Sequence, residues 1–126
     1  MQGYKGNLKD GREIYIPYWP VDVSLENLGK AGKFLGVENL IRISTPDIPA
    51  VILALTTTED AGSTAALIRH FVCEARVDGD RITSANYDTH YKGNLVLVAE
   101  VFSLVVHAQY SDFFVSGLAK ENSPES

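Results

Sequence analysis

The stretch that decides the fold is NLVLVAEVFSLVVHAQYSDFFV, residues 94–115, because it is apolar almost all the way round. Between positions 95 and 108 its only polar side chains are Glu100, Ser103 and His107. They are spaced at a helical period, so in a helix they line one narrow stripe. A surface helix has a much wider polar face. We therefore predict a long helix that fills the centre of the monomer's core or also contacts another subunit.

A long strand is the alternative structure for this stretch. Its many valines are β-branched and favour strands; they are Val96, Val98, Val101, Val105 and Val106. The stretch is, however, longer than an ordinary strand, and a helix is therefore favoured.

Size and charge limit the class of protein. A chain of 126 residues fits one domain and can bury a sizeable core. The 11 basic and 16 acidic residues give a net charge of −5, which argues against non-specific nucleic-acid binding. No cluster of Lys and Arg overrules this average. We expect a single domain over residues 1–126 that binds no nucleic acid.

The sequence also favours a cytoplasmic location. Its single cysteine, Cys73, excludes an internal disulfide and fits a reducing compartment. Residues 1–13 contain no apolar signal core. Residues 95–106 are apolar but short and contain Glu100, which makes them a poor membrane span.

The sequence of the N-terminal part of the chain predicts a β-hairpin. Residues 1–11 are polar and rich in glycine, typical of a mobile or turn-rich segment. Within them, Asp10-Gly11 can close a hairpin between a strand near Tyr4 and a second strand, residues 12–17. The polar residues 119–126 are expected to be flexible as well.

Periodicity and caps predict further helices, and residues 37–44 suit either a strand or a helix. The predicted helices cover residues 25–35, 49–55 and 59–76, with a short one ending at Tyr91. The first would bury Leu25, Leu28, Ala31 and Leu35, and the third Ala61, Ala65, Ile68, Val72 and Ala75. The turn at 77–82 would direct Val77 and Ile82 to the core. The predicted fold is α+β and mostly helical: a short N-terminal hairpin or sheet packed on three or four helices, with the long C-terminal helix at the centre.

Three aromatic residues, Tyr15, Tyr18 and Trp19, lie beside Pro17 and Pro20. Such a cluster can form a groove for an extended or proline-rich peptide. The interpretation that we favour is an aromatic lid packed on the core.

Nothing in the sequence predicts catalysis, a cofactor or a metal site. None of His70, His90 and His107 has a second metal ligand at zinc-site spacing. His107 shares the stripe of Glu100 and Ser103, so we expect it to make a buried polar contact rather than to act in catalysis. The unusually apolar helix points instead to an interaction site.

The second half of the chain resembles the tail assembly chaperones of long-tailed bacteriophages. The shared pattern is an amphipathic helix, a Val-Asp-Gly-x-x-Ile turn, a short helix, and a long apolar helix that ends in an aromatic pair. It is carried by Ala65–Arg76, by Val77, Asp78, Gly79 and Ile82, by Tyr87–Gly93, and by Leu95 through Asp112, Phe113 and Phe114. The resemblance covers residues 59–118.

The resemblance implies a non-enzymatic protein that binds the tape measure protein and keeps it soluble while tail-tube subunits assemble. It also implies self-association, a location in the host cytoplasm and absence from the mature virion. The candidate partner-binding residues are Val98, Val101, Phe102, Val105, Tyr110, Phe113, Phe114, Tyr18 and Trp19. The alternative function is a non-enzymatic adaptor that binds a peptide through Tyr15, Tyr18 and Trp19.

Overall fold

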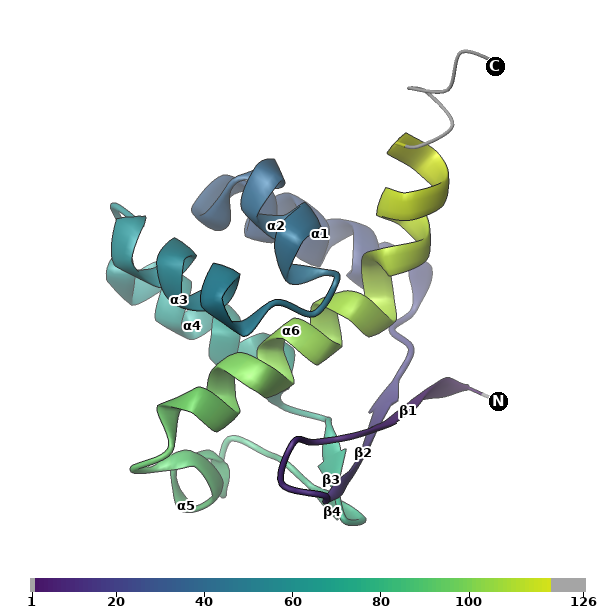
Figure 1. Ribbon diagram of the computed structural model, residues 1–126, viewed down its shortest axis with the longest axis vertical. Helices are drawn as coiled ribbons and strands as arrows, with labels where there is room; N and C mark the ends of the chain where they lie inside the picture. Colours follow the sequence, from purple (N-terminus) through teal and green to yellow (C-terminus); the bar gives the residue numbers. More distant parts are fainter. Residues whose placement is uncertain (1, 119–126) are drawn as a thin grey trace.

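The computed structural model describes residues 2–118 and has the predicted α+β, mostly helical fold (Figure 1). The predicted flexibility of residues 119–126 lies outside the described residues. The strands are β1 (Gly3–Asn7), β2 (Glu13–Pro17), β3 (Arg76–Val77) and β4 (Asp80–Arg81). The helices are α1 (Val21–Leu35), α2 (Val37–Ile43), α3 (Ile48–Thr57), α4 (Ala61–Val72), α5 (Tyr87–Tyr91), α6 (Leu95–Asp112) and the π-helical η1 (Phe113–Leu118).

Helix α6 is the predicted long helix, and it lies at the centre of the fold. It is capped at its N-terminus by Asn94, whose side chain accepts a hydrogen bond from the Leu97 backbone N–H at 3.3 Å. Helices α2, α3, α4 and α5 all contact it. Figure 1 shows α6 crossing the molecule between the other long helices and the sheet.

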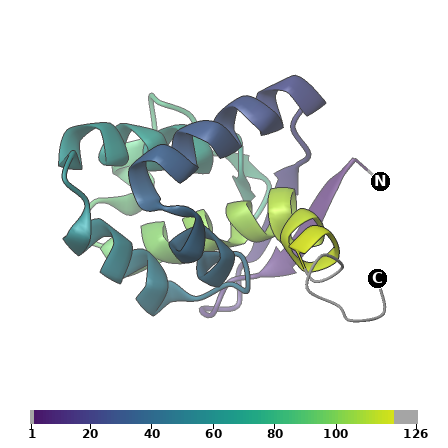
Figure 2. The ribbon, with the colours of Figure 1, turned by 90° about the horizontal axis from the view of Figure 1, so that it is seen from above.

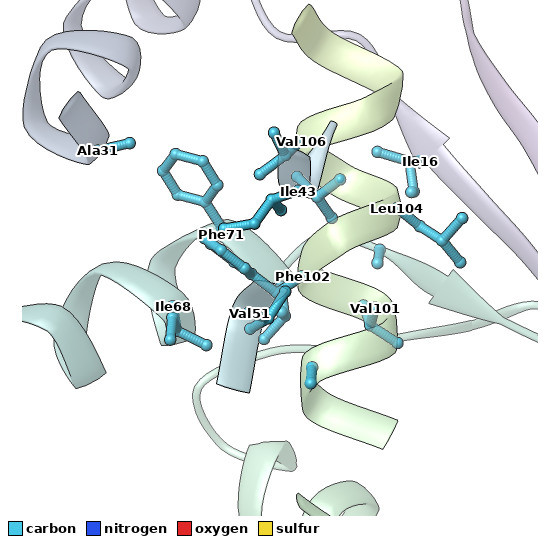
Figure 3. Packing of buried hydrophobic residues seen from close by; sticks show 14 of the residues in the cluster. Ile16, Ala31, Ile43, Val51, Ile68, Phe71, Val101, Phe102, Leu104 and Val106 are labelled. Carbon is cyan, nitrogen blue, oxygen red and sulfur yellow. The ribbon is translucent and has the colours of Figure 1, made fainter. Parts of the chain in front are cut away.

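The apolar sides of α6 are covered by the chain itself. Val101, Phe102, Val105 and Val106 are at most 1% exposed. Figure 3 shows Phe102 and Val106 beside Phe71 of α4, together with residues of α2 and α3. Of the two predicted arrangements, core or subunit contact, the structure has the core for this part of α6.

The polar stripe of α6 faces the N-terminal hairpin and the segment between α2 and α3. Glu100 accepts a hydrogen bond from the Lys9 backbone N–H at 2.7 Å. His107 donates from Nδ1 to the Ser44 carbonyl at 2.8 Å, and its ring meets Tyr4 edge-on. The polar contact predicted for His107 is therefore present. The polar stripe therefore packs against backbone polar groups of other segments, and it does not face solvent.

The sheet contains the predicted hairpin and two further short strands. Its order is β1-β2-β3-β4, and every pairing is antiparallel. Strand β1 occupies much of the segment that we expected to be mobile or turn-rich. Val77 and Ile82 are buried, as predicted, while the pairing of Ile14 with Val77 was not predicted. Residues far apart in the sequence thus form one sheet.

Helix α1 differs from its prediction in both its start and its buried face. It begins at Val21 rather than Leu25. Asn27, Ala31 and Leu35 face the core, whereas Leu25 is 57% exposed. The longer helix therefore leaves apolar side chains at its N-terminal end in solvent.

One open alternative is resolved, and one further helix prediction is corrected. Residues 37–43 form helix α2, which resolves the alternative left open for residues 37–44. Helix α4 ends at Val72 rather than Arg76, and its buried stripe contains Thr64, Leu67, Ile68, Phe71 and Val72. Ala61 and Ala65 are exposed because burying Leu67 and Phe71 removes more apolar surface from water. The described residues form six α-helices where the fold prediction gave three or four, and α5 among them is the short helix predicted to end at Tyr91.

Candidate interaction surface

The segment where α1 begins and the segment where α6 ends each carry exposed apolar side chains. We call this the end surface; it consists of Tyr18, Val21, Leu25, Phe113 and Val115, which are 51–74% exposed. Both ribbon views place the start of α1 and the end of α6 at the same end of the molecule (Figures 1 and 2).

Hydrogen bonds fix the two segments of the end surface to each other. The Tyr110 hydroxyl donates to the Ser24 carbonyl of α1 at 2.7 Å. The Gln109 side chain accepts from the Trp19 backbone N–H at 3.1 Å and donates to the Pro17 carbonyl at 2.9 Å. The exposed residues are therefore held on a preformed scaffold, which favours binding because less ordering is needed.

The predicted partner-binding residues divide according to burial. Val101, Phe102, Val105, Tyr110 and Phe114 are buried in the core cluster. Val98 and Trp19 are partly buried and pack against that cluster. Tyr18 and Phe113 are exposed and belong to the end surface. A partner can reach the second and third sets without unfolding the chain, but not the first.

The aromatic residues near Pro17 do not form one groove. The Trp19 ring packs edge-on against Phe71 with the ring centroids 5.0 Å apart, as a lid on the core would. Tyr15 lies on the sheet beside Arg76, whose guanidinium carbon is 5.8 Å from its ring centroid. In the described part of the chain, no ring contact joins Tyr15, Tyr18 and Trp19. The geometry therefore favours the aromatic lid over the peptide groove for Trp19.

Two more groups of exposed apolar residues lie away from the end surface. Helix α3 exposes Ile52, Leu53 and Leu55 by 38–48%. The first turn of α6 exposes Leu95 and Val96 by 79% and 60%. Leu95 and Val96 lie at the opposite end of α6 from Phe113, which makes them useful controls for the end surface.

The titratable groups with raised pKa values include one thiol and two buried phenols. Burial raises the pKa of the Cys73 thiol, which disfavours the reactive thiolate. Burial also raises the pKa of Tyr91 and of Tyr110. His70 stacks near Trp19. Within residues 2–118, no group of three His, Cys, Asp or Glu side chains lies close enough together to hold a metal ion.

Helix α6 resembles a membrane span in length and composition only. Residues Leu95–Val115 are long and apolar enough to cross a bilayer, but 56% of an 18-residue window within this stretch is buried inside the fold. Core helices of soluble proteins commonly have this composition when other elements cover them.

Sequence reasoning missed Val21 and Leu25 as surface residues. Leu25 was assigned to the buried stripe of its helix, and Val21 was placed before the helix start. The available signal was the apolar i, i+4 spacing of Val21 and Leu25, which places both on one helix face. The sequence alone did not indicate that this face has no partner in the monomer.

Comparisons with known proteins identify the family. Neither a search of curated proteins nor a search of solved structures found a match. The model of a family described as "Phage tail assembly chaperone protein, TAC" matches residues 10–121, which is most of the chain. The chain therefore belongs to the family of phage tail assembly chaperone proteins.

Proposed function

We propose that this protein binds the tape measure protein of its phage and keeps it soluble until tail-tube subunits assemble around it. The observation that carries the proposal is an exposed apolar end surface on a chain of the tail assembly chaperone family. A long helical client presents apolar stripes to water before assembly. It needs a temporary partner rather than a catalyst, and the family likewise suggests a non-enzymatic role.

The end surface is the proposed client site. It offers exposed apolar side chains from two segments that hydrogen bonds hold in place. Amphipathic helices bind to such surfaces through apolar residues spaced three or four positions apart. Phe113 and Leu25 are the central contacts in this proposal, and the Phe113 ring is supported by the ring of the buried Phe114.

Co-expression with the tape measure protein tests this function. We expect this protein to raise the soluble fraction of the client, and the double variant L25D/F113D to lose the effect while it stays folded. Leu25 and Phe113 are 57% and 55% exposed, so their replacement should leave the core intact. The matched control is L95D, because Leu95 is also exposed but lies at the other end of α6.

The outcomes of this experiment distinguish an error in the proposed function from an error in the proposed binding site. If the soluble fraction of the client is the same with and without this protein, the proposed function is wrong. If L95D abolishes the effect and L25D/F113D does not, the role is retained and the end surface is the wrong site.

The proposal includes self-association, a location in the host cytoplasm and absence from the mature virion. The exposed Ile52 and Leu53 of α3 are candidate contacts between copies, because they are apolar and separate from the end surface. Light scattering during size-exclusion chromatography measures the mass directly. We expect an oligomer that I52D/L53D converts to monomers; a monomeric wild-type protein at high concentration would exclude self-association.

A further inference from the structure

A row of basic and aromatic side chains crosses the outer face of the sheet. Lys5 of β1 is paired with Tyr15 of β2, Tyr15 with Arg76 of β3, and Arg76 with Arg81 of β4. Directly paired residues point to the same face. Ile14 and Ile16 point to the other face, into the core.

This face is hollowed over the middle of the row. A surface hollow of about 480 Å³ is lined by Lys5, Tyr15 and Arg76, together with Gly6, Asn7, Glu13, Ile14 and Gly79. The Tyr15 ring lies close over β1 because position 3 is glycine: a Cβ there would lie 2.7 Å from the ring. The floor of the hollow is thus set by the packing of β1 and β2.

The cations at the hollow are free to bind a partner. In the described part of the chain, neither Lys5 nor Arg76 forms an ion pair, and Arg76 lies beside the Tyr15 ring. Arg81, at the end of the row, is already held by Glu74 at 2.6 Å. The lining therefore has two unpaired cations and the single carboxylate of Glu13.

We propose that this hollow binds an acidic segment of another protein, whose carboxylates pair with Lys5 and Arg76 while its chain packs on Tyr15. Adjacent strands are about 4.8 Å apart, so these cations, two strands apart, can receive carboxylates separated by about 10 Å. An arginine beside an aromatic ring is suited to carboxylate recognition because its planar group is already oriented. The site is separate from the end surface and does not depend on the client being a tape measure protein.

Charge favours an acidic protein segment over nucleic acid. A polyanion such as DNA needs many phosphate contacts, whereas this row offers two unpaired cations. The chain as a whole has a net charge of −5, which would repel a long polyanion. A short acidic segment needs only local complementarity.

NMR titration of the ¹⁵N-labelled full-length protein with a blocked octaglutamate peptide tests the proposal. We expect saturable shifts at Lys5, Tyr15 and the Arg76 side chain, no shifts with octaglutamine, and weaker binding at higher salt. The variant K5Q/R76Q should raise Kd about fivefold or more. The matched control K30Q/R42Q removes two cations that already pair with Glu26 and Asp47, and its Kd should be unchanged.

Several results would overturn the proposal. They are the absence of saturable shifts, equal shifts with octaglutamine, or equal loss of affinity in K5Q/R76Q and K30Q/R42Q. A 20-base-pair DNA is titrated in the same way. If it saturates the shifts of the same residues at a lower concentration than octaglutamate does, the ligand is nucleic acid instead.

Discussion

Two buried tyrosines differ in whether the fold satisfies their hydroxyl groups. Tyr91 and Tyr110 are each 3% exposed. The Tyr110 hydroxyl donates to the Ser24 carbonyl at 2.7 Å, whereas the Tyr91 hydroxyl has no hydrogen-bond partner among the described residues. A buried polar group without a partner is unfavourable, so the two hydroxyls should affect stability in opposite directions.

Substitution by phenylalanine should therefore change the free energy of unfolding differently at the two positions. We expect Y110F to lower the free energy of unfolding by about 1 kcal/mol, because it removes a hydrogen bond between α6 and α1. We expect Y91F to leave the free energy of unfolding unchanged or to raise it by up to about 1 kcal/mol. Urea unfolding followed by Trp19 fluorescence measures both; equal losses in the two variants would contradict the assignment.

The same tyrosines predict a loss of stability at alkaline pH. Burial raises the pKa of both phenols above the ordinary value of about 10. Above that pH the unfolded chain loses these protons while the native chain keeps them. The free energy of unfolding should thus be unaffected by these groups below pH 10 and should fall above it by up to about 1.4 kcal/mol per pH unit for each tyrosine.

Urea unfolding between pH 8 and pH 11 measures this dependence. The double variant Y91F/Y110F is the control, because it has no phenol at either position. Its stability should fall less steeply than that of the wild-type protein above pH 10. Equal slopes for the two proteins would show that other groups cause the alkaline loss.

At the scale of elements, α6 forms the centre of the core along its middle and is exposed near its two ends. Its middle is covered on every apolar side, while Leu95, Val96 and Phe113 near its ends are exposed. An apolar helix can therefore be both a core element and part of a binding surface, over different residues. The proposed client site uses only the C-terminal end.

A pair of substitutions tests this division of α6. Val105 is 1% exposed, so V105D buries a carboxylate in the core and should destabilise the fold by about 4 kcal/mol or more. Val96 is 60% exposed and lies in the first helical turn, so V96D should change stability by about 0.5 kcal/mol or less. Circular dichroism during thermal unfolding compares them. A folded V105D protein that only dissociates into monomers would show that Val105 is at a subunit interface.

For the molecule as a whole, the predictions that succeeded rest on signals that are local in the sequence. The turn at 77–82 and the long helix each depend on neighbouring residues. The pairing of Ile14 with Val77 depends on residues from different parts of the chain, which periodicity cannot match. The mostly helical fold was therefore predictable, but the complete sheet was not.

The candidate site was predictable only in part for the same reason. The sequence analysis proposed Tyr18 and Phe113 as candidate partner contacts, and both are exposed. It also selected Val101, Phe102 and Val105, because an apolar helix does not reveal which of its faces other elements will cover. Burial depends on α2, α3 and α4 packing around α6, and that packing is not encoded in any one stretch.

One hydrogen bond between the N-terminal hairpin and α6 gives the last prediction. Glu100, at 9% exposure, accepts from the Lys9 backbone N–H and so ties the β1–β2 loop to α6. The variant E100Q keeps an acceptor oxygen and should lose about 1 kcal/mol of stability, whereas E100L removes the acceptor and should lose about 2 kcal/mol. Hydrogen exchange separates loss of this bond from loss of global stability. The Lys9 amide should exchange much faster in E100L than in E100Q. This increase in rate should be larger than the increase at core amides, such as that of Val105. If the Lys9 amide exchanges at the same rate in both variants, Glu100 does not hold the loop, and the hairpin is fixed to α6 by its other contacts, the Tyr4–His107 ring contact and the Gln109–Pro17 hydrogen bond.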